Sequence, residues 1–167
     1  MCYEVKENVP NRIYYNNTKL KWEDFIGKPP VENTYNKSDI IAGIASDFYW
    51  QIDSIGSQIT SIKLYCFMDK SISYVESYVK EYSSSEEYLL HEQNHFDITF
   101  IYTKILERVL KGSKGLTIDK LNNLFVAHHK RMRLYQNRYD NETHYNTSNQ
   151  LKWNRIIDSL LVIVKKY

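Results

Sequence analysis

The sequence predicts an α+β fold in which an N-terminal antiparallel β-sheet packs on a C-terminal helical part. Two patterns lead to this prediction: residues 12–69 contain apolar runs with strand-like alternation, and residues 84–165 carry apolar residues at helical spacing. The 167 residues suit one domain, 1–167, and such a chain can bury a core without disulfides.

The clearest strands are expected at residues 40–50 and 62–68. In the second run Ile62, Leu64, Cys66 and Met68 share one face, which is the period of a half-buried antiparallel strand. Turn-forming residues at 53–57 separate the two runs and predict a hairpin. Residues 20–22 predict a further short strand.

Three helices are expected, at about residues 86–111, 117–139 and 149–165, with a polar loop over 140–148. Ser84 and Glu87 have the spacing of a capping box that would open the first helix. The residues expected to face the core are Ile98, Ile101, Ile105 and Val109 in the first helix, Leu121, Leu124, Phe125, His128, Met132, Tyr135 and Tyr139 in the second, and Trp153, Ile157, Leu160 and Val164 in the third.

Charge and cysteine content exclude several classes of protein. The chain has 22 basic and 20 acidic residues, a net charge of +2, which is too small to indicate a nucleic-acid or anionic-membrane partner. No apolar stretch approaches the roughly 20 residues of a membrane span, so no integral span is expected. The two cysteines, Cys2 and Cys66, form no disulfide framework. Cys2 would suit the acylated cysteine of a processed lipoprotein.

The chemistry-bearing motif is His91-Glu92-Gln93-Asn94-His95, an H-E-x-x-H pattern within the first expected helix. Residues four apart lie on one helix face, so His91 and His95 can bind one zinc ion. Glu92 is rotated about 100° from His91 and can take a proton from a zinc-activated water. This arrangement predicts zinc-dependent hydrolysis of a peptide or protein substrate, with Glu92 as general base.

A catalytic zinc site needs a third protein ligand. His144 is the first choice, because imidazole is a favoured zinc ligand and His144 falls in a loop that can reach the metal. His128 is the alternative, although a hydrogen-bonded core histidine is the simpler interpretation of its place on the apolar stripe. Asp140 and Asp97 are the acidic candidates, although a carboxylate at either position is better suited to accept the outer N–H of a ligand histidine.

Two tyrosines, Tyr139 and Tyr145, could donate a hydrogen bond to the oxyanion of a tetrahedral intermediate. Tyr139 falls on the helix stripe, so packing is the expected use of its ring. Two other functions share these residues: a catalytically inactive metallopeptidase-like protein that binds or supports a partner, and an amidase that acts on cell-wall peptides.

The chain resembles the bacterial family of zinc-dependent peptidases called domain of unknown function 922. The segments that carry the resemblance are LKWEDFIGKP (20–29), LHEQNHFDI (90–98) and YDNETH (139–144), the last followed by Gln150 and Trp153. The resemblance implies a compact, zincin-like metallopeptidase fold and an extracytoplasmic location, and it implies no particular substrate.

The chain departs from the family pattern at two places. Asn94 stands where the family has glycine, a change that a helix tolerates. After the Tyr-Asp pair the family has Thr, one residue and then His, whereas this chain has Thr143-His144-Tyr145. The histidine is therefore one position early, and the third ligand is the open question of the motif.

Overall fold

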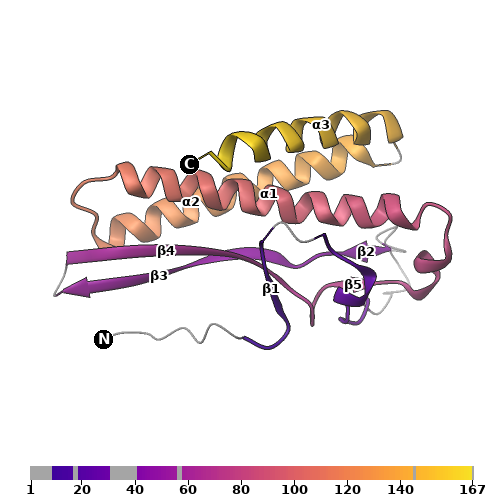
Figure 1. Cartoon of the computed structure of the whole chain (residues 1–167), viewed down its shortest axis with the longest axis horizontal. Helices are drawn as coiled ribbons and strands as arrows, with labels where there is room; N and C mark the ends of the chain where they lie inside the picture. Colours follow the sequence, from indigo (N-terminus) through magenta and orange to yellow (C-terminus); the bar gives the residue numbers. More distant parts are fainter. Residues whose placement is uncertain (1–8, 17–18, 31–40, 56–57, 145, 167) are drawn as a thin grey trace.

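The computed structural model describes residues 9–16, 19–30, 41–55, 58–144 and 146–166. It confirms the predicted α+β architecture, in which an N-terminal antiparallel sheet packs against three C-terminal helices. Figure 1 shows the helices on one side of the sheet, with α1 nearest the strands. Cys2 and Tyr145 lie outside the described residues.

The main sheet has the strand order β1–β4–β3 and is antiparallel throughout. Its strands are β1 (Arg12–Tyr14), β3 (Ser46–Ile55) and β4 (Gln58–Asp69). β3 and β4 form the predicted hairpin, although residues 56–57 between them are outside the described part of the chain. The alternation in β4 is also confirmed, because Cys66 and Met68 are buried while Lys63 is exposed.

A smaller sheet pairs β2 (Ala42–Gly43) with β5 (Tyr74–Val75), and two 3-10 helices, η1 (Trp22–Asp24) and η2 (Ser77–Glu81), complete the N-terminal half. The strand predicted at residues 20–22 is wrong. The Leu20 N–H donates to Oε1 of Gln93 at 2.9 Å, so this donor binds a helix side chain and enters no strand ladder.

The helices are α1 (Ser85–Gly112), α2 (Ile118–Thr143) and α3 (Thr147–Val164). The start of α1 agrees with the prediction, but the capping box is wrong, because the Ser84 side chain makes no capping hydrogen bond. The end of α2 also differs from the predicted loop over 140–148, because the helix runs to Thr143 and α3 begins at Thr147. This extension places residues 140–143 on a rigid helix.

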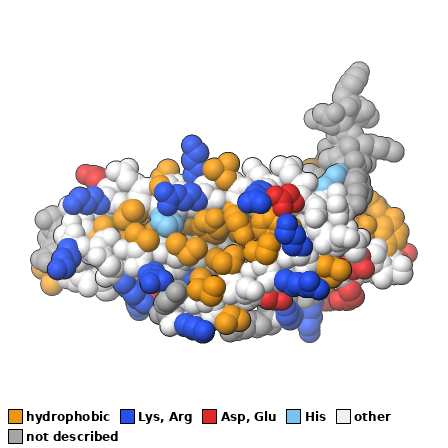
Figure 2. All heavy atoms as spheres, turned by 90° about the horizontal axis from the view of Figure 1, so that it is seen from above, with side chains coloured by type: hydrophobic (Ala, Val, Ile, Leu, Met, Phe, Trp, Pro, Cys, Tyr) orange, Lys and Arg blue, Asp and Glu red, His pale blue; other side chains and the backbone are white. Residues whose placement is uncertain are grey.

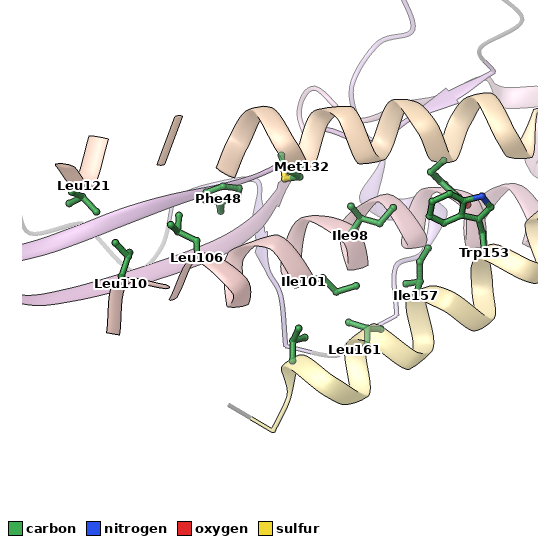
Figure 3. Packing of buried hydrophobic residues seen from close by; sticks show 12 residues of the cluster. Phe48, Ile98, Ile101, Leu106, Leu110, Leu121, Met132, Trp153, Ile157 and Leu161 are labelled. Atoms are coloured by element: carbon green, nitrogen blue, oxygen red, sulfur yellow. The ribbon is translucent and has the colours of Figure 1, made fainter. Parts of the chain in front are cut away.

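The predicted core faces of α2 and α3 are confirmed. Leu121, Met132 and Tyr139 are fully buried, and Trp153 and Ile157 are buried beside them. Figure 3 shows side chains from β3 and all three helices meeting in this core. Their close packing fixes the position of α2 and α3 against α1.

The stripe predicted for α1 is correct only in its first half. Ile98 and Ile101 are buried, but Ile105 and Val109 are 38% and 37% exposed, and Leu106 and Leu110 are buried in their place. Figure 1 shows that the last turns of α1 extend past the end of α3. In these turns Leu106 and Leu110 join Leu121 of α2 in the core, so the buried face of α1 is rotated from the predicted one.

His128 points inward from α2 as predicted and is only 4% exposed. Its Nδ1 atom is buried and has no hydrogen-bond partner among the described residues. Burial, helped by the positive charge of Arg131, lowers the pKa of the ring below its ordinary value. A folded protein that keeps this ring neutral loses stability as the pH falls below about 6.5, because the unfolded chain then binds the extra proton.

Replacement of His128 by leucine should raise the free energy of unfolding by about 1 kcal/mol at pH 7, because it removes an unpaired buried nitrogen. The gain should be larger at pH 5, because the leucine variant has no proton to bind in the unfolded state. Urea denaturation at both pH values, in the presence of a chelator, measures the two differences. Equal stability gains at pH 5 and pH 7 would show that His128 does not titrate on unfolding.

None of the helices in the described part of the chain has the length and apolar character needed to cross a membrane. Figure 2 shows the helical side of the molecule from above, with a band of hydrophobic side chains and scattered Lys and Arg around it. α2 and α3 carry several exposed apolar side chains, among them Val126, Leu134, Leu151 and Val162.

Candidate metal centre

Three side chains from two helices converge on one point near the start of α1. Nε2 of His95 lies 2.7 Å from Oδ1 of Asp140 and 3.2 Å from Nε2 of His91. The third pair, His91 Nε2 and Asp140 Oδ1, is 3.3 Å apart. Among the described residues, His91, His95 and Asp140 form the cluster of potential ligand side chains whose ligand atoms lie close enough together to hold a metal ion.

Helix geometry explains the convergence. His91 and His95 are four residues apart on α1 and therefore share a face. Gln136, one turn before Asp140 on α2, donates Nε2–H to the His95 carbonyl at 3.2 Å and to Thr99 Oγ1 at 3.0 Å. Because α2 continues as a helix beyond Gln136, the next turn brings Asp140 over the two imidazoles.

The donor set and its spacing fit zinc. Zinc in proteins accepts imidazole nitrogen and carboxylate oxygen at about 2.0–2.2 Å in a tetrahedral shell, which separates neighbouring ligand atoms by roughly 3.3 Å. The three measured separations of 2.7–3.3 Å are close to that value. Three protein ligands are also the number found in catalytic zinc sites, whereas structural sites use four.

The electrostatics of the group favour a positive charge between the three side chains. Burial alone would raise the pKa of Asp140, but hydrogen bonds from His91 and His95 outweigh it and hold that pKa well below its usual range. Burial likewise lowers the pKa of His91, yet Asp140 and the charge of Glu92 raise it overall. A site that stabilises a proton in this way offers the same stabilisation to a metal cation.

Gln150 on α3 fixes the orientation of His91. Its Oε1 lies 3.1 Å from His91 Nδ1, and its Nε2 donates to the Tyr139 hydroxyl and to Asn154 Oδ1, both at 2.8 Å. Since both amide protons are used, Oε1 is the acceptor and His91 carries its proton on Nδ1. A His91 ring that gives up its second proton, the one shared with Asp140, therefore presents the Nε2 lone pair towards Asp140 and His95.

Tyr139 packs behind the two histidines, as its place on the helix stripe predicted. Its fully buried ring stacks on His91, with centroids 4.6 Å apart, and meets His95 edge-on at 5.0 Å. Its hydroxyl accepts hydrogen bonds from Asn94 Nδ2 at 3.2 Å and from Gln150. The hydroxyl therefore belongs to the network that supports the site. Asn94 also donates to Asn154 at 2.6 Å, so the residue that replaces glycine has partners of its own.

Glu92 is buried on the neighbouring face of α1, towards the small sheet. It is 6% exposed, and its Oε2 accepts the main-chain N–H of Ile44 at 2.9 Å. Ile44 directly follows β2 and precedes β3, so the sheet holds the carboxylate in one orientation. Of the three candidate ligands, Asp140 has a side chain that is 49% exposed and His91 one that is 27% exposed.

The other predicted site residues lie elsewhere. His144 is the exposed C-cap of α2, where its N–H donates to the Asp140 carbonyl at 2.9 Å, and the metal-ligand group does not include it. His128 is also outside that group. Asp97 accepts hydrogen bonds from the Tyr15 hydroxyl at 2.8 Å and from Gln93 at 2.9 Å, and no contact joins it to a ligand histidine. The structure thus brings Asp140 to the place for which the sequence favoured His144.

One sequence signal could have located Asp140 correctly. The buried positions His128, Met132, Gln136, Tyr139 and Thr143 continue the helical spacing of α2 past residue 139. A helix of that length places Asp140 beside Tyr139 on a fixed face. No comparable local signal indicates Gln150, whose role depends on how α3 packs against α1.

Comparisons of the chain with protein-family models, with curated proteins and with solved structures found no match. The function of the site is therefore inferred from its own residues.

Proposed function

We propose that the chain is a zinc-dependent hydrolase of peptide bonds, in which His91, His95 and Asp140 hold the metal and Glu92 is the general base. The observation that carries the proposal is the convergence of three zinc-type ligand atoms within 3.3 Å, with a carboxylate one residue along the same helix turn. A peptide or protein is the substrate class that this chemistry serves.

When bound, zinc polarises a carbonyl oxygen and lowers the pKa of a coordinated water towards about 7. Glu92 accepts the proton that the attacking water gives up and transfers it to the leaving amine, so one water is consumed for each bond cleaved. The Ile44 N–H binds one oxygen of Glu92 and leaves the second oxygen for this transfer. Gln150 holds His91 in the tautomer that presents Nε2.

The resemblance to the zinc-dependent peptidase family supports the same function. The three segments that carry it meet around the site, although they are far apart in the sequence. Leu20 binds Gln93, the Trp22 indole N–H donates to Ser85 Oγ at 2.8 Å, and Gln150 contacts His91. Membership of that family would add an extracytoplasmic location to the proposal.

A non-catalytic role is the second candidate, and the burial of Glu92 favours it. A carboxylate that is 6% exposed and accepts a main-chain N–H is typical of a structural hydrogen bond, here between α1 and the segment that follows β2. The metal group would then stabilise the fold or help the protein to bind a partner. An amidase acting on cell-wall peptides would use the same chemistry as a peptidase.

Metal removal tests the proposed function. The purified protein should bind about one zinc ion per chain and cleave members of a mixed library of quenched fluorogenic peptides, and a chelator should abolish cleavage until zinc is restored. His91→Ala and His95→Ala should lose the zinc, while the matched control His129→Ala, which removes a histidine paired with Asp47, should keep it. Equal zinc content in all four proteins would reject the site.

A further inference from the structure

The small β2–β5 sheet places a tyrosine next to the candidate general base. Gly43 of β2 pairs with Tyr74 of β5, and the tyrosine ring lies directly against the glycine. A Cβ added at Gly43 would come within 3.0 Å of ring atom Cε1 and 3.3 Å of the hydroxyl oxygen. A Cβ at this position would require the ring to shift by a few tenths of an ångström.

The residue that follows β2 connects this ring to the site. Ile44 follows Gly43 directly, and its N–H donates to Oε2 of Glu92 at 2.9 Å. The Tyr74 hydroxyl therefore lies beside Gly43, and the residue after Gly43 binds Glu92. The charge of Glu92, after the larger effect of burial, raises the pKa of Tyr74, which is consistent with this proximity. The phenol stays protonated at neutral pH and remains a hydrogen-bond donor.

Tyr74 differs from the other tyrosines near the site in having an uncommitted hydroxyl. Tyr139 is fully buried and accepts two hydrogen bonds, and Tyr15 donates to Asp97. Tyr74 is half-buried, and no other described residue makes a hydrogen bond to its hydroxyl. It is thus a donor beside Glu92 that can bind a substrate atom.

We infer that Tyr74 is a further catalytic residue, whose hydroxyl donates a hydrogen bond to the scissile carbonyl oxygen as that oxygen becomes the tetrahedral oxyanion. This inference rests on the proposed peptide hydrolysis at the same site. Tyr74 keeps its proton throughout the reaction, while Glu92 carries the water proton to the leaving amine. The donor and the base are then held by consecutive residues, Gly43 at the end of β2 and Ile44 directly after it.

Tyr74→Phe in the full-length, zinc-loaded protein tests the inference, with the quenched fluorogenic peptide library as the probe. The substitution removes one oxygen and keeps the ring that packs on Gly43. Loss of one oxyanion donor lowers kcat by about 10²–10³-fold, and KM, zinc content and Tm should stay near the wild-type values. Tyr65→Phe is the matched control, because Tyr65 alternates with the buried Cys66 and lies on the sheet face away from the helices.

The possible results separate the role of Tyr74 from the proposed peptide hydrolysis. A kcat of Tyr74→Phe within about 3-fold of Tyr65→Phe, well short of the loss expected for an oxyanion donor, would overturn the role of Tyr74 and leave peptide hydrolysis standing. Loss of zinc in Tyr74→Phe would also overturn it, because the hydroxyl would then support the metal group. Wild-type cleavage no greater than that of Glu92→Gln would reject the proposed function and this inference with it.

Discussion

Replacement of Asp140 by alanine should abolish tight zinc binding by a protein that otherwise folds normally. Asp140 supplies one of the three converging ligand atoms and the only negative charge among them. Loss of a ligand should reduce zinc affinity by more than the roughly 10–100-fold that loss of a hydrogen-bonding neighbour costs. The substitution also removes the ion pairs that Asp140 makes with the two histidines, so the Tm of the chelated protein should fall modestly.

Two further variants should differ from Asp140→Ala in their zinc affinity. Gln150→Ala removes the acceptor that orients His91 and should weaken binding by about 10–100-fold. His144→Ala removes an exposed side chain four residues from Asp140 and should bind zinc as the wild type does. Competition titration against a chromogenic chelator measures all three affinities. A larger loss in His144→Ala than in Asp140→Ala would assign the third ligand to His144.

The difference between the predicted loop at residues 140–143 and the observed helix has a physical origin at the end of α2. Asp140, Asn141 and Thr143 have short polar side chains that compete with the helix backbone for hydrogen bonds and favour turns. Tertiary contacts keep them helical: the Trp153 indole N–H donates to Glu142 Oε2 at 3.0 Å, and Asn149 Nδ2 donates to the Glu142 carbonyl at 2.8 Å. Such long-range contacts override local preference, and a single sequence does not display them.

The predictable parts of the molecule are those that bury one continuous apolar face. The β3–β4 hairpin, the start of α1 and the core faces of α2 and α3 follow from their periodicity. The H-E-x-x-H spacing likewise brings His91 and His95 together, because that geometry is local to one helix.

The intervening residues of the motif show what periodicity misses. Gln93 and Asn94 are both buried polar side chains, and each binds a different distant segment. Gln93 accepts from the Leu20 N–H, and Asn94 donates to Tyr139 and Asn154. One turn of α1 therefore joins the N-terminal segment, α2 and α3, so its polar residues have a structural use that no spacing rule predicts.

Substitution of Glu92 by glutamine should lower peptide cleavage by about 10²–10⁴-fold while zinc binding and Tm stay close to the wild-type values. The amide oxygen of glutamine can still accept the Ile44 N–H, so the contact between α1 and the sheet survives. The amide cannot take a proton from water, so only the chemistry is lost. Cleavage rate, zinc content and thermal unfolding of the same preparation give the three measurements.

Glu92→Ala separates the catalytic role of this side chain from a structural one. Alanine removes the base and also leaves the Ile44 N–H without its partner, which should cost about 1 kcal/mol of unfolding free energy. If Glu92 is the general base, both variants lose cleavage and only the alanine variant loses stability. If Glu92 serves only as a tie between α1 and β2, the glutamine variant should behave as the wild type in every assay. Full turnover by Glu92→Gln would therefore exclude Glu92 as the base and favour the non-catalytic role of the metal centre.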